Sequence, residues 1–497
     1  MMRNTEERRL TVAELLPACE ELLAQGGRMS MAWGWFPGSA AREICYLAAP
    51  GPRRPFVLWR CGVTDETLPS LAVRAPALSW HEREISDLCG IPFSGHPKGH
   101  PLVLHAGAEP VTPPLNPAYP REVGMPFTRR RAHAPDVAGS DIQELPFGPV
   151  RADVTESAQF LFFYLGEHIL HYLPRLFFKH RGMEKRFAGL TAELGVVLAE
   201  RVSGVGSVAH ALAYCQAVEA AGGCEVPPRA RWLRVLMAEL ERLYNHLHYF
   251  GHLADTTTLK VGQAEGKLLE ERVKQINAIT GSRFLRNLLV PGGLRRDIHL
   301  YAGLATELGR LQKDVNAYLK QLAHTGSYLD RLITTGVLDR EMALAQGATG
   351  PVARASGLDE DVRRDHAYAA YADMDMDVRV PLRTAGDANA RAEVRAEEIE
   401  VSFALLLRLL VRLPAGEVRA ACQPAASAEG LGWSESPRGA LFYAVHFDEQ
   451  GKLARVKIRS PSFSNWRVFQ YTVRDSNMMD YAINKASFGL TIAGCDR

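Results

Sequence analysis

Residues 180–206 read HRGMEKRFAGLTAELGVVLAERVSGVG, two charged clusters separated by an apolar segment. Apolar residues recur at i, i+3 and i+4 spacing, which predicts a helix over residues 184–204. The same spacing continues over residues 207–221, 228–254, 265–280, 300–335 and 393–413. Helices of this length predict a mostly helical body built as a bundle.

The flanking segments favour strands as well as helices. Residues 10–25 have helical spacing, whereas short apolar runs at 43–48 and 56–61 are typical of strands. The Pro-rich stretch 106–146 reads as a linker. We expect a short β element near 160–164, a hairpin over 440–447 and 452–458, and a last helix over 477–485. The predicted fold class is α+β: a small N-terminal α/β domain (1–105), the linker (106–146), and a mostly helical domain (147–497) with a β hairpin at each end.

Composition narrows the function classes. The formal net charge is +2, from 58 basic and 56 acidic residues, so no global electrostatic footprint for nucleic acid is present. None of the eight cysteines forms a CxxC pair, which predicts a reduced compartment rather than a disulfide scaffold. The apolar stretch 403–413 contains Arg408 and is shorter than the roughly 20 residues that span a bilayer. Membrane association is therefore expected to be peripheral and through partners.

One N-terminal stretch carries a specific motif. Residues 80–97 read WHEREISDLCGIPFSGHP, which by charge alone is a salt-bridged helix followed by a turn. The string resembles the signature of the small hydrophilic core subunit of complex I, WxERExxDxxGIxFxGHP. The resemblance covers about residues 10–100 and implies a docking domain without a cofactor of its own.

The rest of the chain resembles the large core subunit of complex I and the large subunit of energy-converting [NiFe]-hydrogenases. The matches include HRGMEK at 180–185, ERV at 200–202, VPGG at 290–293 and KIRSPSF at 457–463, in the order of the family. Ten such matches in order are far more specific than one short motif. Fusion of the two parts in one chain resembles the formate hydrogenlyase large subunit.

The metal-binding positions of the family are altered. A [NiFe] centre needs four thiolates, supplied as two CxxC pairs, because soft sulfur ligands hold nickel and low-spin iron. The four positions read Ser203, Gly206, Thr491 and Gly494, and Cys495 lies one residue out of place. We therefore predict that the chain holds no metal and no nickel–iron centre.

The quinone-binding positions are altered as well. The complex I branch has a histidine in its entry hairpin and a tyrosine after its (D/E)RL motif, and the resemblance implies that both contact quinone. Here these positions read Arg151 and Gly204. The site is thus neither a standard hydrogenase centre nor a standard quinone site.

Charged residues remain around the altered positions. A set of buried carboxylates and bases can relay protons, and the alternative is a structural ion-pair network. For His180, tuning of a partner's iron–sulfur cluster is a further hypothesis. The candidate catalytic residues are Glu156, Glu200, Arg201 and Asp496, and the candidate cofactor-contacting residues are Arg151, His180, Arg181, Gly204 and Arg497.

The resemblance implies a peripheral subunit on the cytoplasmic face of the plasma (inner) membrane. It would receive electrons from a partner iron–sulfur subunit of the small-core type and contact antiporter-like membrane subunits. Its activity would be that of an oxidoreductase of the NADH dehydrogenase and hydrogenase superfamily. The electron acceptor would be quinone, another small molecule or none, and electron transfer would be coupled to proton or ion movement. No GxGxxG follows a strand, so NAD is not expected on this chain. The rival hypothesis is a scaffold without redox chemistry, and a third is a working hydrogenase.

Overall fold

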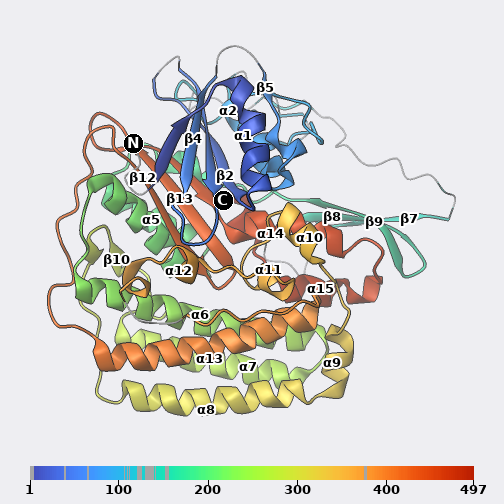
Figure 1. Cartoon of the computed structure of the whole chain (residues 1–497). Helices are drawn as coiled ribbons and strands as arrows, with labels where there is room; N and C mark the ends of the chain where they lie inside the picture. The colour runs from blue at the N-terminus through green and yellow to red at the C-terminus, as the bar shows by residue number, and fades with distance from the viewer. Residues whose placement is uncertain are drawn as a thin grey trace.

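A computed structural model describes residues 5–38, 41–63, 67–105, 107–108, 110, 112–119, 126–128, 139, 141–150, 156–373 and 378–497. It has the predicted α+β class, with a small sheet at the N-terminus, a helical body and further strands toward the C-terminus (Figure 1). No helix within those ranges is both long and apolar enough to cross a membrane.

A four-stranded sheet forms the N-terminal part, in the order β1-β4-β3-β2, and only β1 and β4 are parallel within it. The first helix begins after Thr11, whose backbone N–H donates to Glu14 Oε2 at 2.8 Å in a capping box. The elements are β1 (Glu6–Arg9), α1 (Val12–Ala24), β2 (Arg28–Trp35), β3 (Glu43–Ala49), β4 (Val57–Gly62), β5 (Leu68–Pro69), α2 (Ser79–Cys89) and β6 (Phe93–Ser94).

Both faces of this sheet are buried. Successive side chains on a strand point to opposite faces. Tyr46 and Trp59 pack with α1 and α2, whereas Trp33 and Leu47 belong to the core of the rest of the molecule. Trp33 Nε1 also donates to Nε2 of His446 at 3.1 Å. The N-terminal sheet therefore shares a hydrophobic core with the segments that follow it.

A three-stranded antiparallel sheet, β7-β8-β9, comes next and projects from the body on the right of Figure 1. The helix predicted over residues 184–204 is two helices, which corrects that expectation. Between them, Gly189 has a φ of +83°, and the second helix begins after Thr191, which is its N-cap. The elements are β7 (Gln143–Phe147), β8 (Gln159–Leu165), β9 (His168–Arg175), α3 (Met183–Arg186), α4 (Ala192–Val202) and α5 (Ser207–Gly222).

Long helices build the lower part of Figure 1, where α6, α7, α8 and α13 lie in layers. The helix predicted over residues 300–335 is interrupted at Thr325, whose backbone is extended, so it is also two helices. The elements are α6 (Pro228–Thr256), α7 (Lys260–Thr280), β10 (Leu289–Val290), β11 (Gly293–Leu294), α8 (Leu304–Ala323), α9 (Gly326–Leu332), α10 (Arg340–Ala345), α11 (Pro351–Ala355), α12 (Val362–Asp365) and α13 (Ala388–Arg412).

A second three-stranded sheet, β12-β13-β14, lies between the N-terminal sheet and α5. The predicted hairpin is confirmed as β13 and β14. The sequence reading missed β12, because Gly430 and Gly432 weaken the strand pattern. The elements are β12 (Glu429–Ser436), β13 (Gly439–Phe447), β14 (Leu453–Arg459), α14 (Pro461–Phe469), α15 (Tyr481–Phe488) and α16 (Ile492–Asp496).

Candidate functional site

The first pair of altered positions lies in the turn between α4 and α5. Ser203 follows the last residue of α4 and is buried, and Gly206 precedes the first residue of α5. The backbone N–H of Gly206 donates to the Ser203 carbonyl at 3.0 Å. This bond closes the turn and holds the two positions together.

The second pair lies on α16 and meets the first pair in space. Thr491 is the N-cap of α16, and its Oγ1 accepts from the Gly494 N–H at 3.2 Å. A Cβ on Gly494 would lie 2.6 Å from Thr491 Oγ1, 3.4 Å from Ser462 Oγ and 3.5 Å from Ser203 Oγ. Three hydroxyl groups thus surround the Cα of Gly494, and Ser462 is a member that the sequence reading did not identify.

These residues do not fit a nickel–iron centre. Neutral hydroxyl groups cannot replace bridging thiolates as soft ligands. Burial raises the pKa of the Cys495 thiol well above its usual range, so this neighbouring sulfur is protonated at neutral pH. Within the described residues, no group of three or more His, Cys, Asp and Glu side chains is arranged for a metal ion.

Asp496 is the most unusual carboxyl group near the altered positions. It is fully buried, and its Oδ2 accepts from the backbone N–H of Lys179 at 3.0 Å. Its Oδ1 has no hydrogen-bond partner of ordinary geometry among the described residues. Burial raises the pKa of Asp496 to about 7, and nearby Glu156 acts in the same direction. A carboxyl of this kind gains or loses its proton close to neutral pH.

The Glu156 side chain lies beside the N-terminus of α16. Its two carboxylate oxygens accept from the backbone N–H groups of Ile492 at 2.6 Å and Ala493 at 3.2 Å. Lys179 Nζ lies 3.4 Å from the same carboxylate. Glu156 therefore satisfies N–H groups that a helix N-terminus leaves free, and it brings a negative charge near Asp496.

Arg181 joins the two altered segments. Its guanidinium donates to the carbonyl oxygens of Arg201 at 3.0 Å, Val202 at 2.6 Å and Ala493 at 3.2 Å. Burial lowers the pKa of Arg181. The side chain bridges the end of α4 and the middle of α16 without a carboxylate partner in these bonds.

His180 contacts α16 from the other side. Its Nδ1 donates to the carbonyl of Asp496 at 2.6 Å, and burial lowers the pKa of the ring. The imidazole is therefore neutral at pH 7, with its proton on Nδ1.

Glu200, Arg201 and Gly204 make their side-chain and carbonyl contacts with residues other than Asp496. The Glu200 carboxylate accepts from the backbone N–H of Asn287 at 2.6 Å, and the Arg201 side chain is 53% exposed. The Gly204 carbonyl accepts from Arg286 Nη2 at 2.8 Å. Glu200 and Gly204 thus hold the turn against the 285–287 loop. Arg151, the candidate in the entry hairpin, lies outside the described residues.

Arg497 extends into a buried ion cluster between the N-terminal part and the body. Its guanidinium lies 2.9 Å from Glu84 of α2 and 3.1 Å from Glu184 of α3. Lys457 of β14 contacts the same two carboxylates at 2.6 and 3.3 Å. Burial alone would raise the pKa of Glu184, but Lys457, Arg455 and Arg497 hold it well below its usual range. The Glu184 carboxylate therefore stays charged inside the protein.

A cavity of about 590 Å³ opens beside this cluster. One part of its lining, the basic wall, is mainly basic, and another part, the apolar wall, comes from α2 and from residues after it. The basic wall consists of His180, Arg181, Lys185, Arg186 and Arg497 together with the carboxylates of Glu84 and Glu184, and the apolar wall includes Leu88, Leu104, Pro114, Leu115 and Tyr119. Three of the residues predicted from the sequence thus line one hollow.

Glu241 is another group that the sequence reading missed. Its carboxylate accepts from the first N–H groups of α5, at Val208 (2.7 Å) and Ala209 (2.9 Å). Burial raises the pKa of Glu241 to about 7. Because Glu241 lies on α6, no local sequence pattern connects it to the altered turn.

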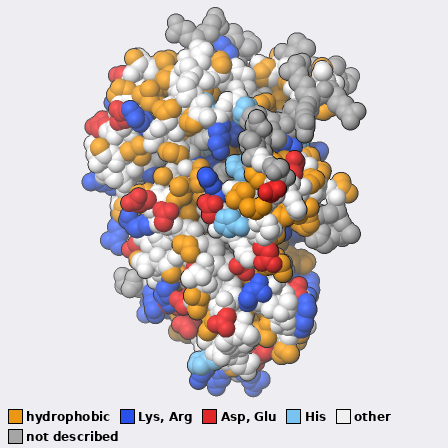
Figure 2. Space-filling view, turned by 90° about the vertical axis from the view of Figure 1, so that its right-hand side faces the viewer, with side chains coloured by type: hydrophobic (Ala, Val, Ile, Leu, Met, Phe, Trp, Pro, Cys, Tyr) orange, Lys and Arg blue, Asp and Glu red, His pale blue; other side chains and the backbone are white. Residues whose placement is uncertain are grey.

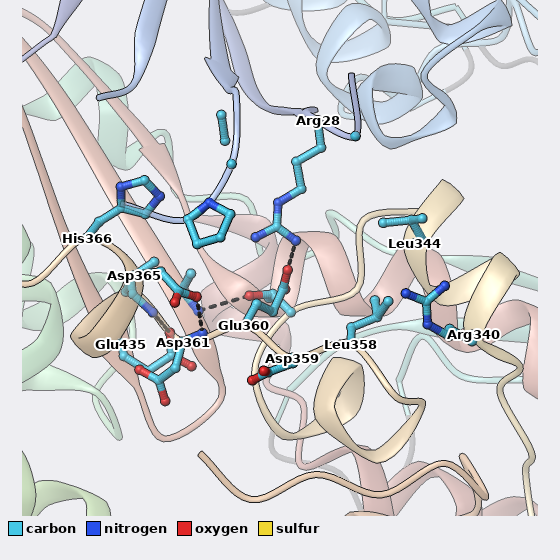
Figure 3. Close-up of a pocket in the computed structure, with 17 residues that line it drawn as sticks. Arg28, Arg340, Leu344, Leu358, Asp359, Glu360, Asp361, Asp365, His366 and Glu435 are labelled. Carbon is cyan, nitrogen blue, oxygen red and sulfur yellow. Dashed lines mark hydrogen bonds and ion pairs between the residues drawn. The ribbon is translucent and has the colours of Figure 1, made fainter. Parts of the chain in front are cut away.

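A smaller cavity of about 200 Å³ lies between β2 and the segment before α12. Figure 3 shows Arg28 extending from the N-terminal part to form an ion pair with Glu360. Burial, with Asp361 nearby, raises the pKa of Glu435 at the inner end to about 7. This cavity contains none of the residues predicted from the sequence.

On the face that Figure 2 shows, acidic and basic side chains are interspersed, in agreement with the near-neutral net charge.

Family comparisons identify the class of protein that this fold and site define. The nickel-dependent hydrogenase family matches residues 181–266, and the 49 Kd subunit family of the respiratory-chain NADH dehydrogenase matches 267–430 and 422–497. The 30 Kd subunit family of the same enzyme matches 42–122. The chain belongs to the family of fused 30/49-kDa-type core subunits that complex I shares with formate hydrogenlyase and membrane-bound hydrogenases.

Individual relatives agree with this assignment. Formate hydrogenlyase subunit 5 of Escherichia coli K12 is 30% identical over 83% of this chain and 74% of its own length. The C/D subunit of the NADH-quinone oxidoreductase of Gluconacetobacter diazotrophicus is 28% identical over 93% of this chain and 85% of its own. A chain of the archaeal membrane-bound sulfane sulfur reductase superimposes with a TM-score of 0.67 at 26% identity, covering 72% of this chain and 99% of its own.

Proposed function

We propose that this chain is a peripheral subunit of a membrane-bound, respiratory-type oxidoreductase complex, and that it exchanges a proton at Asp496 instead of holding a metal. Family membership supports the first part, because the relatives named above are subunits of such complexes. The fully buried Asp496, with a pKa of about 7, carries the second part. Electrons would stay on a partner's cluster, and the charge change there would alter the protonation of Asp496.

The proposed partners come from the family resemblance, and one surface near this site supports one of them. The cavity with the basic wall is where an iron–sulfur subunit of the small-core type would dock, close to His180. Antiporter-like subunits would hold the assembly at the cytoplasmic face of the plasma membrane. In this proposal residues 1–105 form the docking domain, 106–146 the linker and 147–497 the hydrogenase-like domain.

Infrared spectroscopy tests the role of Asp496. In the native complex at pH 7, the dithionite-reduced minus oxidised spectrum should contain a carboxylic-acid C=O band that is absent from the Asp496→Asn variant. With varying pH, the same band should fade as pH rises, with a midpoint near 7, because a raised pKa keeps the carboxyl protonated below that value. A Glu241→Gln variant, which removes another carboxyl with a pKa of about 7, should keep the Asp496 band.

A non-catalytic scaffold is the second candidate function. The observation that favours it is the close packing at Gly494, where hydroxyl groups occupy the space of the lost thiolates. A scaffold predicts no Asp496 band in the redox-difference spectrum, even though the pH titration could still reveal one. The two functions are therefore separated by the redox measurement.

Co-purification tests the docking surface. A tagged chain isolated from native membranes should retain an iron–sulfur subunit and membrane subunits. Arg186→Glu reverses an exposed charge on the basic wall and should reduce the retained iron–sulfur subunit several-fold. Lys313→Glu, an equal charge reversal on exposed α8, should leave retention unchanged. Equal retention in both variants would argue against docking at this cavity.

Quinone as the electron acceptor stays a prediction. Arg151 lies outside the described residues, and the Gly204 carbonyl accepts from Arg286 and from the Ser207 hydroxyl.

A further inference from the structure

Two cysteines far apart in the sequence lie together at the far end of α5 from the altered turn. Cys224 directly follows Gly223, the left-handed cap of α5, and Cys422 lies in the segment between α13 and β12. Cys224 Sγ donates to the carbonyl of Ala421, the residue before Cys422, at 3.4 Å, and a contact between the two thiols shifts the pKa of each. None of the residues assigned to the proposed function takes part in these contacts.

The loop that carries Cys422 is held in place by backbone contacts. The N–H of Ala420 donates to the Gly292 carbonyl at 2.9 Å, and Gly293 pairs with Arg419 in an isolated bridge. A Cβ on Gly292 would lie 3.2 Å from the Cβ of Cys422. The Gly292 backbone thus lies close to the Cys422 side chain, and the segment that carries Cys422 is fixed to residues 292–293.

Exposure distinguishes this pair from the other cysteines. Cys224 and Cys422 are half-buried, whereas the remaining six are buried. The neighbours Gly223, Glu225, Ala421 and Gln423 are exposed. A small reagent in solution can therefore reach these two cysteines more readily than the other six.

We propose that Cys224 and Cys422 form a redox-active dithiol pair, which a low-molecular-weight disulfide converts to an intramolecular disulfide. An S–S bond is roughly 2.05 Å long, and because Cys224 contacts the residue next to Cys422, side-chain rotation can bring the two sulfurs together. The product would tie the end of α5 to the segment that leads into β12. The Cys224–Cys422 pair is thus a modification site outside the altered centre.

The chemistry proceeds by thiol–disulfide exchange. The Cys224 thiolate attacks the reagent disulfide, forms a mixed disulfide and releases one reagent thiol. The Cys422 thiolate then attacks the Cys224 sulfur and releases the second reagent thiol. Two electrons pass from the protein to the reagent, and the two thiol protons end on the released thiols.

The order of attack follows from the hydrogen bond between the thiols. Burial raises the pKa of Cys224 and of Cys422. Donation from the Cys422 S–H to Cys224 opposes this shift at Cys224 and adds to it at Cys422. Cys224 is thus the better attacking thiol. Because the thiolate is the reactive form, the rate should rise with pH between 7 and 9.

Mass mapping of the full-length chain tests the proposal with glutathione disulfide as the reagent. After incubation, alkylation and digestion, we expect a cross-linked peptide pair containing Cys224 and Cys422, and an intact mass lower by two hydrogen atoms. Dithiothreitol should restore both free thiols. Recovery of the two cysteines only as alkylated residues, or only as separate glutathione adducts, overturns the proposal.

Single variants provide the controls. Cys422→Ser should stop at the mixed disulfide, with one glutathione on Cys224. Cys61→Ser removes a buried thiol elsewhere and should leave the cross-link intact. A cross-link that persists in Cys422→Ser through a different cysteine would contradict the assignment of the pair.

Discussion

At the residue scale, the altered centre is defined by a missing side chain. Gly494 lies among three hydroxyl groups, and the closest of them already caps α16. The family's thiolate would begin with a Cβ at this point, in space that Thr491 Oγ1 now occupies. Absence of the family's cysteines therefore coincides with hydrogen bonding among the residues at their positions.

Gly494→Ala should destabilise the protein by about 1–2 kcal/mol, because the new Cβ forces Thr491 Oγ1 out of its capping bond. Denaturant unfolding measures the change. Gly309→Ala is the matched control within α8, where a Cβ meets nothing within 4 Å. It should raise stability by about 0.5–1 kcal/mol. A neutral Gly494→Ala would mean that the hydroxyl cluster is loosely packed.

At the element scale, β12 lies directly on α5, the helix that begins at the altered turn. A Cβ on Gly432 would lie 2.1 Å from the Ala213 carbonyl and 2.5 Å from the Ala217 N–H nitrogen. The clash is with helix backbone, which cannot rotate away. The glycines that concealed β12 from a strand-pattern search are the ones that its packing requires.

Gly432→Ala should destabilise the protein by about 3 kcal/mol, since either β12 or α5 must move. Gly62→Ala is the control, also on a strand, where a Cβ meets nothing within 4 Å. It should have little effect. Thermal melting of both variants gives the comparison, and equal midpoints would contradict the close contact between β12 and α5.

At the scale of the whole molecule, the N-terminal part and the body are joined by charge as well as by the shared core. Glu84 of α2 contacts both Lys457 and Arg497 in a fully buried cluster. Arg497 directly follows α16, which carries two of the altered positions and Asp496. The N-terminal part therefore supports the segment that carries the candidate site.

Glu84→Gln should destabilise the protein by about 3 kcal/mol, because two buried cations lose a shared counter-charge. The reference is Glu271→Gln, which breaks an exposed pair with Arg283 and should change stability far less. Urea unfolding followed by tryptophan fluorescence reports both. Similar losses in the two variants would mean that the buried cluster contributes no more than a surface pair.

The sequence by itself determined the α+β class, most helices, the family, and the four positions without thiolates. These depend on local periodicity and on residue identity, which need no knowledge of distant partners. It did not predict the breaks at Gly189 and Thr325, because single backbone conformations interrupt a continuous apolar pattern there.

Only the tertiary structure decided what the altered positions have become. In the folded chain, Ser203 and Ser462 lie close to Gly494, and Cys224 lies beside Cys422. Burial of Asp496 raises its pKa to about 7. The physical reason is that pKa values, hydrogen bonds and ion pairs depend on burial and on groups hundreds of positions away. A sequence pattern records the residues but not which of them share a space.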